Sequence, residues 1–343
     1  MKPLFAPEPA RTPQQGKTAV LLINLGSPDA PTAEAVRPYL ARFLSDQRVV
    51  ELPKTLWQLI LRGLILPFRP KASAHGYSKI WLHEGSPLAV YTEKQAKLLA
   101  AALPENIIVR HAMSYSAPFV GEVMAELKAE GVSQLLAVPL YPQYAASSSG
   151  AALDKVFETM LQQRNMMSLR TVRGFHNHPA YIEALREQVA RYWQEHGRGE
   201  KLMMSFHGIP QAQYDNGDPY PDECRETARL LAAALGIGEN DYIVSFQSQF
   251  GKAKWVGPST QDLFGSLPKQ GVEKLDVICP AFVADCLETM EEIALAGREQ
   301  FHEAGGRQFH YIPCLNDNAA WIHALAALCR ENLGGWLAEE QAG

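Results

Sequence analysis

The chain contains few cysteines, and none lies in a pattern that holds a metal or a disulfide framework. Five occur among 343 residues, and no two are spaced C-x-x-C. An odd number without such spacing predicts reduced thiols in a cytosolic protein, not a disulfide-bonded secreted domain or a structural zinc site. The N-terminal sequence MKPLFAPEPARTPQQG has no apolar core, which excludes a secretory signal peptide.

Long runs of one charge are also absent. The net charge is −5, and no block of Lys and Arg is long enough for a nucleic-acid surface, so we expect no nucleic-acid partner. No predicted strand is followed by G-x-G-x-x-G or G-x-x-x-x-G-K-[ST], and the G-x-S-x-G turn is missing. These absences exclude the two common nucleotide-binding loops and the nucleophile turn of α/β hydrolases.

The longest apolar segment, LWQLILRGLILPF at residues 56–68, is too short to span a membrane. Two interpretations are open. The segment is either a buried core helix or an exposed apolar lip, within residues 54–71, that lies on a membrane or binds a hydrophobic ligand. Lys54, Arg69 and Lys71 flank the apolar residues and would suit an anionic membrane surface.

Apolar, β-branched segments of strand length alternate with helical patterns along most of the chain. Eight strands are predicted, at residues 19–25, 106–114, 134–141, 168–175, 201–206, 241–247, 274–280 and 309–315. Such alternation predicts parallel sheets with helices on both faces. We therefore predict an α/β fold of two Rossmann-like, doubly wound domains, each with a four-stranded parallel sheet.

Domain boundaries follow from these elements. The N-terminal domain is predicted to comprise residues 17–172 and to include the apolar lip, and the C-terminal domain residues 173–335. Residues 1–16 and 336–343 are predicted to be tails, because they are polar or rich in proline. The last helix, AAWIHALAALCREN, is expected to cross back onto the first domain.

A histidine follows one of the predicted strands. In LMMSFHGIPQAQYDNGDPY, residues 202–220, an apolar run ends at His207 and turn residues follow. In parallel sheets ligands bind beyond the carboxyl ends of the strands, and an imidazole exchanges protons near neutral pH. His207 is therefore a candidate for proton transfer, and a histidine satisfied by loop carbonyls is the alternative.

A group of carboxylates follows the seventh predicted strand. Glu288, Glu291 and Glu292 are spaced i, i+3 and i+4, so we expect them to share one face of a helix. Such a cluster suits a divalent cation or a proton relay. Asp285 and Glu288 also fit a capping box, D-x-x-E, which is a purely structural explanation.

A third polar segment, QSQFGKAKWVGPST at residues 247–260, again follows a strand. It places Trp255 in a loop, either as an exposed aromatic wall or as a core residue that anchors the loop. A histidine, carboxylates, an aromatic wall and an apolar lip together suit a large, flat, hydrophobic ligand that meets a metal.

These segments resemble the ferrochelatase family, whose members insert ferrous iron into protoporphyrin IX to make protoheme. The resemblance covers about residues 17–332, and its most specific element is the segment around His207. Further matches, in the family's order, are LLINLGSP (21–28), EGSPL (84–88), LYPQY (140–144), QSQFG with the following W and P-x-T (247–260), and CPAFVADCLETMEEI (279–293).

The resemblance implies a lyase with a chelatase-like fold, and it implies roles for individual residues. His207 would be the catalytic histidine and an iron ligand, and Glu288 its catalytic partner and a second iron ligand. Glu292 and Asp285 would form a route for protons or iron. The residues implied to contact the porphyrin are Leu25, Arg69, Ser86, Tyr115 and Trp255.

Some positions depart from the family's pattern. Ser114 stands where many relatives have arginine, and Cys286 where many have histidine. Animal-type members hold an iron–sulfur cluster on cysteines near the LYPQY motif and at the C-terminus, but here the first region reads QYAASSSG. We therefore expect no iron–sulfur cluster and no permanently bound cofactor, with ferrous iron as a substrate.

The alternatives at this point are coproporphyrin as the porphyrin, a chelatase for another tetrapyrrole, or a bilobed heme or metal carrier without catalysis. The apolar lip favours the less charged protoporphyrin. It also leads us to expect a cytoplasmic protein in peripheral contact with the inner face of the membrane.

Overall fold

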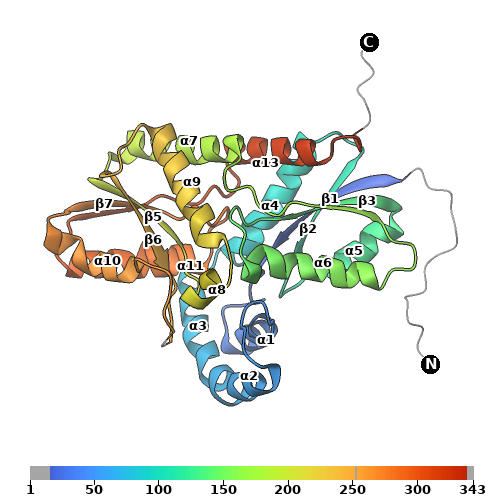
Figure 1. The fold of residues 1–343 in the computed structure, drawn as a ribbon, viewed down its shortest axis with the longest axis horizontal. Helices are drawn as coiled ribbons and strands as arrows, with labels where there is room; N and C mark the ends of the chain where they lie inside the picture. Colours follow the sequence, from blue (N-terminus) through green and yellow to red (C-terminus); the bar gives the residue numbers. More distant parts are fainter. Residues whose placement is uncertain (1–15, 252, 338–343) are drawn as a thin grey trace, which may run out of the picture.

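The protein, described by a computed structural model over residues 16–251 and 253–337, contains two four-stranded parallel sheets (Figure 1). The first sheet has the order β2-β1-β3-β4, from β1 (Lys17–Asn24), β2 (Ile107–Met113), β3 (Val132–Pro139) and β4 (Ser168–Thr171). The second has the order β6-β5-β7-β8, from β5 (Lys201–His207), β6 (Tyr242–Gln247), β7 (Lys274–Ile278) and β8 (Gln308–Tyr311). The predicted α/β class and all eight strands are confirmed.

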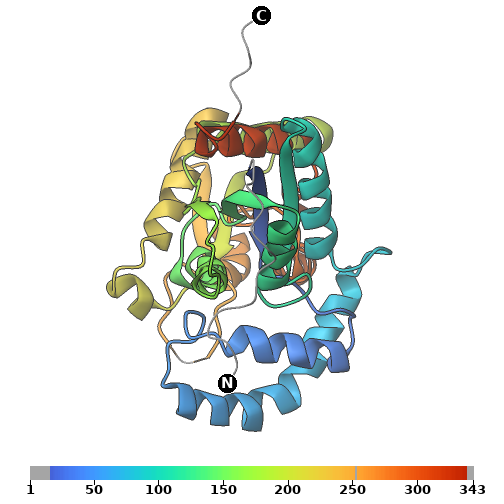
Figure 2. The same ribbon diagram turned by 90° about the vertical axis from the view of Figure 1, so that its right-hand side faces the viewer.

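Helices cover both sheets and form a projection on one side. In chain order the longer ones are α1 (Ala33–Leu44), α2 (Lys54–Ile60), α3 (Leu66–Ile80), α4 (Pro87–Ala102), α5 (Val120–Ala129), α6 (Ala151–Leu161), α7 (Pro179–His196), α9 (Tyr220–Leu235), α10 (Thr260–Ser266) and α13 (Ala319–Asn332). Shorter ones are α8 (Gln211–Asp215), α11 (Leu287–Thr289), α12 (Arg298–Glu303) and the 3-10 turn η3 (Pro268–Gln270). Three π-helical turns, η1 (Leu61–Ile65), η2 (Ala146–Gly150) and η4 (Met290–Gly297), were not predicted. The projection consists of α1 to α3 (Figure 2).

Two strands end well before their predicted ends. β4 and β8 end at Thr171 and Tyr311, four residues before their expected ends. The apolar residues that follow, such as Phe175 and Leu315, leave the sheets and are buried elsewhere. Their hydrophobicity therefore reflects burial between the two halves of the molecule and not strand pairing.

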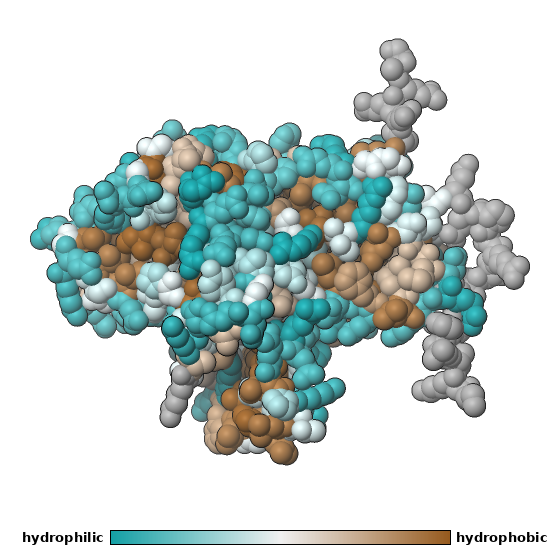
Figure 3. Space-filling view, in the orientation of Figure 1, coloured by the Kyte–Doolittle hydropathy of each residue, from teal (hydrophilic) through white to brown (hydrophobic). Residues whose placement is uncertain are grey.

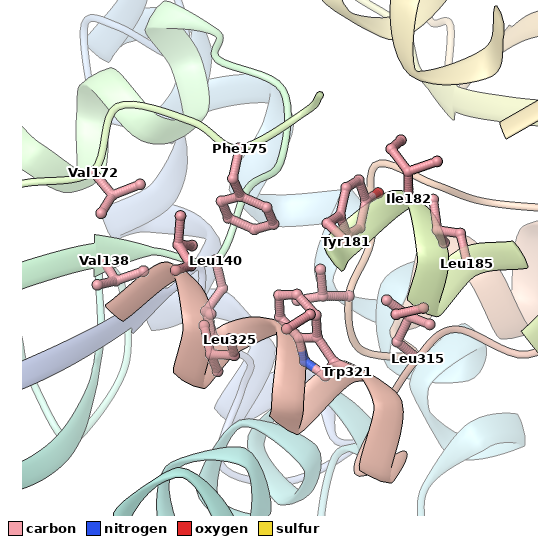
Figure 4. Close-up of a cluster of buried hydrophobic side chains, with 14 of the residues drawn as sticks. Val138, Leu140, Val172, Phe175, Tyr181, Ile182, Leu185, Leu315, Trp321 and Leu325 are labelled. Carbon is pink, nitrogen blue, oxygen red and sulfur yellow. The ribbon is translucent and has the colours of Figure 1, made fainter. Parts of the chain in front are cut away.

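The junction between the halves is a single apolar cluster (Figure 4). Helices α7 and α13, which follow β4 and β8, pack against each other, and α13 also packs against α4 of the first half. The fully buried Trp321 stacks on Phe175 at a centroid distance of 5.7 Å and meets the edge of Tyr181 at 6.1 Å. The last helix of the second half, α13, thus lies on the first half and helps to hold the two together.

The predicted tails lie almost entirely outside the described residues. Only Gly16 of the N-terminal tail, and residues 336–337 of the C-terminal one, are part of the described structure. Within the described residues no helix is both long and apolar enough to cross a membrane.

Candidate active site

His207 is the last residue of β5 and lies beside Gln247, the last residue of β6. The ring is half-buried, and its Nδ1 lies 2.7 Å from the carbonyl oxygen of Gly208. A carbonyl only accepts hydrogen bonds, so Nδ1 must carry the proton in this contact. The Nε2 of a neutral His207 therefore keeps a free lone pair, which is the atom a proton acceptor or metal ligand needs.

The helix that carries the carboxylates begins differently from the prediction. Its N-cap is Cys286, whose sulfur accepts from the backbone N–H of Thr289, while the Thr289 hydroxyl accepts from the Cys286 N–H at 3.0 Å. The predicted capping box of Asp285 and Glu288 is therefore wrong, because the chain enters the helix one residue later. Asp285 instead accepts hydrogen bonds from the side chains of Thr289, Tyr311 and Asn316.

The three glutamates do not form one cluster. Glu291 turns to α3 and pairs with Lys79 at 2.9 Å. Glu288 and Glu292 remain close enough for the charge of Glu288 to act on the Glu292 carboxyl. They lie on either side of the change from α11 to the π-helical turn η4, whose wider turn alters the spacing on which the prediction relied.

Glu292 is enclosed by hydrogen-bond donors from other segments. Ser248 donates its backbone N–H at 2.7 Å and its hydroxyl at 2.6 Å, and the side chains of Gln247 and Gln261 donate as well. Burial raises the pKa of the Glu292 carboxyl, the Ser248 bonds and the His207 charge oppose the rise, and the Glu288 charge adds to it. Glu292 thus lies within electrostatic reach of both catalytic candidates.

The raised pKa of Glu292 predicts a specific pH dependence of stability. Above the usual carboxyl pKa of about 4.3, the folded protein holds a proton that the unfolded chain has released, so this contribution to stability falls as the pH rises. We expect the unfolding free energy of the wild type minus that of Glu292→Gln to decrease from about pH 4 to pH 7. Denaturant unfolding at a series of pH values measures this difference. A constant or increasing difference would contradict the raised pKa.

Glu288 lines a small pocket between the two halves. Its walls come from the loop after β1, from α1 and α3, from the start of α4 and from the residues around α11. The predicted porphyrin contacts Leu25 and Ser86 line the same pocket. Ser86 is the N-cap of α4 and donates its hydroxyl to that of Ser27 at 2.7 Å. The pocket therefore brings hydroxyl and apolar groups next to the carboxylate of Glu288.

Tyr115, another predicted porphyrin contact, does not line this pocket and reaches it only through Leu25. Its backbone N–H donates to the carbonyl oxygen of Leu25 at 3.1 Å. Its phenol is buried and donates to Asp46 at 2.9 Å, and burial together with Asp46 raises the phenol pKa far above its usual value. The hydroxyl is thus already engaged, and the side chain supports the pocket from behind.

Arg69 and Trp255, two further predicted porphyrin contacts, both lie against the ring of Phe250. The Arg69 guanidinium lies 5.4 Å from the centre of the Phe250 ring, and that ring lies 4.9 Å from the Trp255 ring. Trp255 also lies against Gly208, where a Cβ atom would be only 3.2 Å from the indole. The glycine next to His207 therefore allows the tryptophan to approach the histidine strand closely.

The apolar lip is exposed along one face. Leu59, Leu64 and Phe68 are 74%, 63% and 73% exposed, whereas Leu61 between them is 1% exposed. The interpretation as a buried core helix is therefore wrong for most of the segment. A hydrophobic patch covers the end of the projection in Figure 3.

Three residues were not predicted to contact Glu292. Gln247, Ser248 and Gln261 all donate to Glu292. The first two stand at the carboxyl end of β6, and that position was the available signal. Across the described parts of the chain, no three His, Cys, Asp or Glu side chains converge as a preformed metal site.

Comparisons with known proteins agree on one family. The family model described as Ferrochelatase matches residues 17–333. The ferrochelatase of Neisseria gonorrhoeae is 67% identical over 333 residues, which cover 97% of this chain and 99% of that protein. The ferrochelatase of Chromobacterium violaceum is 52% identical over 339 residues, covering 97% and 93%.

Solved structures support the fold alone. SirB from Bacillus subtilis with Fe3+ superposes with a TM-score of 0.55 at 13% identity, covering 92% of this chain and 95% of that one. The sirohydrochlorin chelatase SirB from Bacillus subtilis subspecies spizizenii, in complex with cobalt, gives 0.56 at 9% identity, covering 93% and 96%. The prediction of a chelatase-like fold is confirmed.

Proposed function

This chain belongs to the ferrochelatase family, and from that premise we propose that His207 and Glu288 are its catalytic pair. The enzyme is a lyase that inserts ferrous iron into protoporphyrin IX to form protoheme, the terminal step of heme biosynthesis. What supports the pair is one arrangement. A histidine with a free Nε2 ends β5, and the residues that follow β7 place Glu292 where the charges of both His207 and Glu288 act on its carboxyl.

The reaction requires a base and a weak metal ligand. A free porphyrin carries two pyrrole N–H protons, and both must leave before the four nitrogens bind a metal. His207 accepts a proton at Nε2 because Nδ1 donates to the Gly208 carbonyl. Imidazole and carboxylate groups also bind ferrous iron without the strong retention that several thiolates would cause.

Glu288 and Glu292 supply the acidic side of the site. Glu288 faces the pocket between the halves and acts as the second iron ligand, and Glu292 behind it accepts protons or hydrated iron. The donors around Glu292 favour its ionised form, while burial favours its neutral form. Such opposed effects suit a carboxyl that takes up and releases a proton. Asp285 stays a weaker candidate, because three side chains already donate to it.

The porphyrin contacts remain proposals of the same kind. Leu25 and Trp255 offer apolar surface to the ring, Arg69 offers donors for its carboxylates, and Ser86, whose hydroxyl donates to Ser27, offers a hydroxyl at the pocket wall. Tyr115 would act through the loop that it holds in place.

An anaerobic absorbance time course with ferrous iron tests the activity on protoporphyrin and coproporphyrin. If the absorbance spectrum remains that of the metal-free porphyrin, the protein is instead a carrier that performs no insertion.

We propose that the protein contacts the inner face of the cytoplasmic membrane through the lip. Protoporphyrin and heme are nearly insoluble in water, so a site beside a bilayer shortens their transfer. Each apolar side chain that leaves water contributes about 1.5–3 kcal/mol at full burial. Lys54 and Lys71 flank the exposed residues and would add attraction to anionic lipid.

The lip makes a testable prediction. We expect the double variant Leu59→Ser/Phe68→Ser to bind anionic vesicles at least about tenfold more weakly, equivalent to about 1.4 kcal/mol, and to show a higher KM for porphyrin. Both side chains are exposed, so the melting temperature should not fall. Vesicle sedimentation measures the binding, and Leu161→Ser, at a residue 74% exposed on α6, is the control. Equal binding by the wild type and both variants would refute the membrane contact.

We also propose that the enzyme carries no iron–sulfur cluster. The five cysteines are all buried and unbridged, and Ala145 and Ala146 occupy the region after LYPQY. We expect heme-free preparations to be colourless and to contain no acid-labile sulfide. Stoichiometric iron and sulfide in such a preparation would contradict this proposal.

A further inference from the structure

We infer that Gln247 is a positioning residue that holds His207 and the two carboxylate residues in a fixed relation, an inference that rests on the function proposed above. Gln247 ends β6, is 0% exposed, and lies directly beside His207 in the sheet. The N–H of Gly208 donates to the Gln247 carbonyl at 2.8 Å. The backbone of Gln247 thereby also fixes Gly208, the residue that follows His207.

The side chain of Gln247 reaches the opposite part of the site. Its Nε2 donates to the backbone carbonyl of Glu288 at 2.8 Å and to Oε2 of Glu292 at 3.3 Å. A carbonyl oxygen only accepts, so the amide nitrogen and not the amide oxygen must face Glu288. One residue therefore joins the strand that carries His207 to both carboxylate residues after β7.

Buried hydroxyls surround the other end of the Gln247 amide. The Ser205 hydroxyl donates to Oε1 of Gln247 at 2.8 Å, and it lies 2.8 Å from the Thr260 hydroxyl, which donates to Ser245 at 2.8 Å. All of these side chains are fully buried. The orientation of the amide is set at its other end, because the Glu288 carbonyl only accepts hydrogen bonds, and a turned amide would place its oxygen against that carbonyl with no proton between them.

The two ends of the amide have partners of different kinds. The hydroxyl chain alone would satisfy one end of a buried glutamine. The other end is satisfied by two acceptors that belong to the catalytic side of the site. A partner behind a metal-binding or catalytic group commonly changes activity by about 10- to 100-fold when it is removed. Gln247 acts in this way, through Glu288 and Glu292, and does not touch the substrates.

The test is Gln247→Met, which keeps the length of the side chain and removes its hydrogen bonds. We expect kcat for iron insertion to fall by about 10- to 100-fold, while the Kd for protoporphyrin, measured by fluorescence, stays at the wild-type value. The matched control is Thr260→Val, which interrupts the hydroxyl chain but leaves both donors of the amide in place. We expect Thr260→Val to lower the melting temperature and to keep kcat near the wild-type value.

Four results decide the inference. A folded Gln247→Met protein with wild-type kcat would overturn it, and so would equal losses of kcat in Gln247→Met and Thr260→Val. If Gln247→Met fails to fold, Gln247→Glu replaces it in the test. This variant keeps the contact with Ser205 but places an acceptor against the Glu288 carbonyl, and a wild-type kcat would overturn the inference. Activity lost in His207→Ala but kept in Gln247→Met refutes the positioning role alone, whereas activity kept in His207→Ala refutes the catalytic assignment.

Discussion

His207→Ala is expected to abolish measurable iron insertion, with kcat lower by about 10²- to 10⁴-fold, the range typical of a lost acid–base group. The ring is the group whose Nε2 is free to take a pyrrole proton. Its removal deletes one local hydrogen bond, so the loss of stability should be only about 1 kcal/mol. Stopped-time absorbance assays under anaerobic conditions and thermal unfolding measure the two effects separately.

The comparison for this variant is His323→Ala, which removes an exposed histidine on α13. That protein should insert iron like the wild type. If His207→Ala does so too, His207 is only a loop residue that satisfies Gly208. If His207→Ala is unfolded while His323→Ala is not, the histidine is structural, and the assignment of the base must move elsewhere.

Glu288→Gln should lower kcat by about 10²- to 10³-fold and leave porphyrin affinity nearly unchanged. The substitution keeps the shape of the side chain in the pocket and removes its charge. It also leaves the start of the helix intact, because the reciprocal capping bonds join Cys286 and Thr289. The assay separates kcat from the KM values for iron and porphyrin.

Glu291→Gln is the matched comparison, since it changes the neighbouring glutamate that pairs with Lys79 at the surface. Surface ion pairs contribute little to stability, so this variant should retain both its fold and its activity. Full activity in Glu288→Gln would remove the need for a carboxylate there. Equal losses in both variants would point to a general effect of charge on this helix.

The order of the elements could be predicted from the sequence because each strand is a short apolar run between helical patterns. The ends of β4 and β8 could not, since Phe175 and Leu315 are buried at the junction and are as apolar as strand residues. The π-helical turns were missed because their few residues give no distinct periodicity. The choice between a buried helix and an exposed lip could not be made, because an apolar segment with only Gln58 and Arg62 on one face fits either alternative.

The site was partly predictable for a similar reason. His207 and Glu288 follow strands, and that position marks them in a parallel sheet. The partners of Glu292 come from the loop after β6 and from α10, and no spacing in the sequence links Ser248 or Gln261 to it. The separation of Glu291 from the cluster depends on Lys79, which lies 212 residues away along the chain.

The packing of α13 on α4 of the first half affects how often the two halves can separate. Rotation of one half against the other would expose Trp321, which lies in the apolar cluster shared by the two halves (Figure 4). A tryptophan buries about 200 Å², and at about 25 cal/mol per Å² its exposure costs about 5 kcal/mol. Only about one molecule in several thousand would then be open through this junction at any moment. Porphyrin must therefore bind to molecules in which the two halves stay together, because these form nearly the whole population.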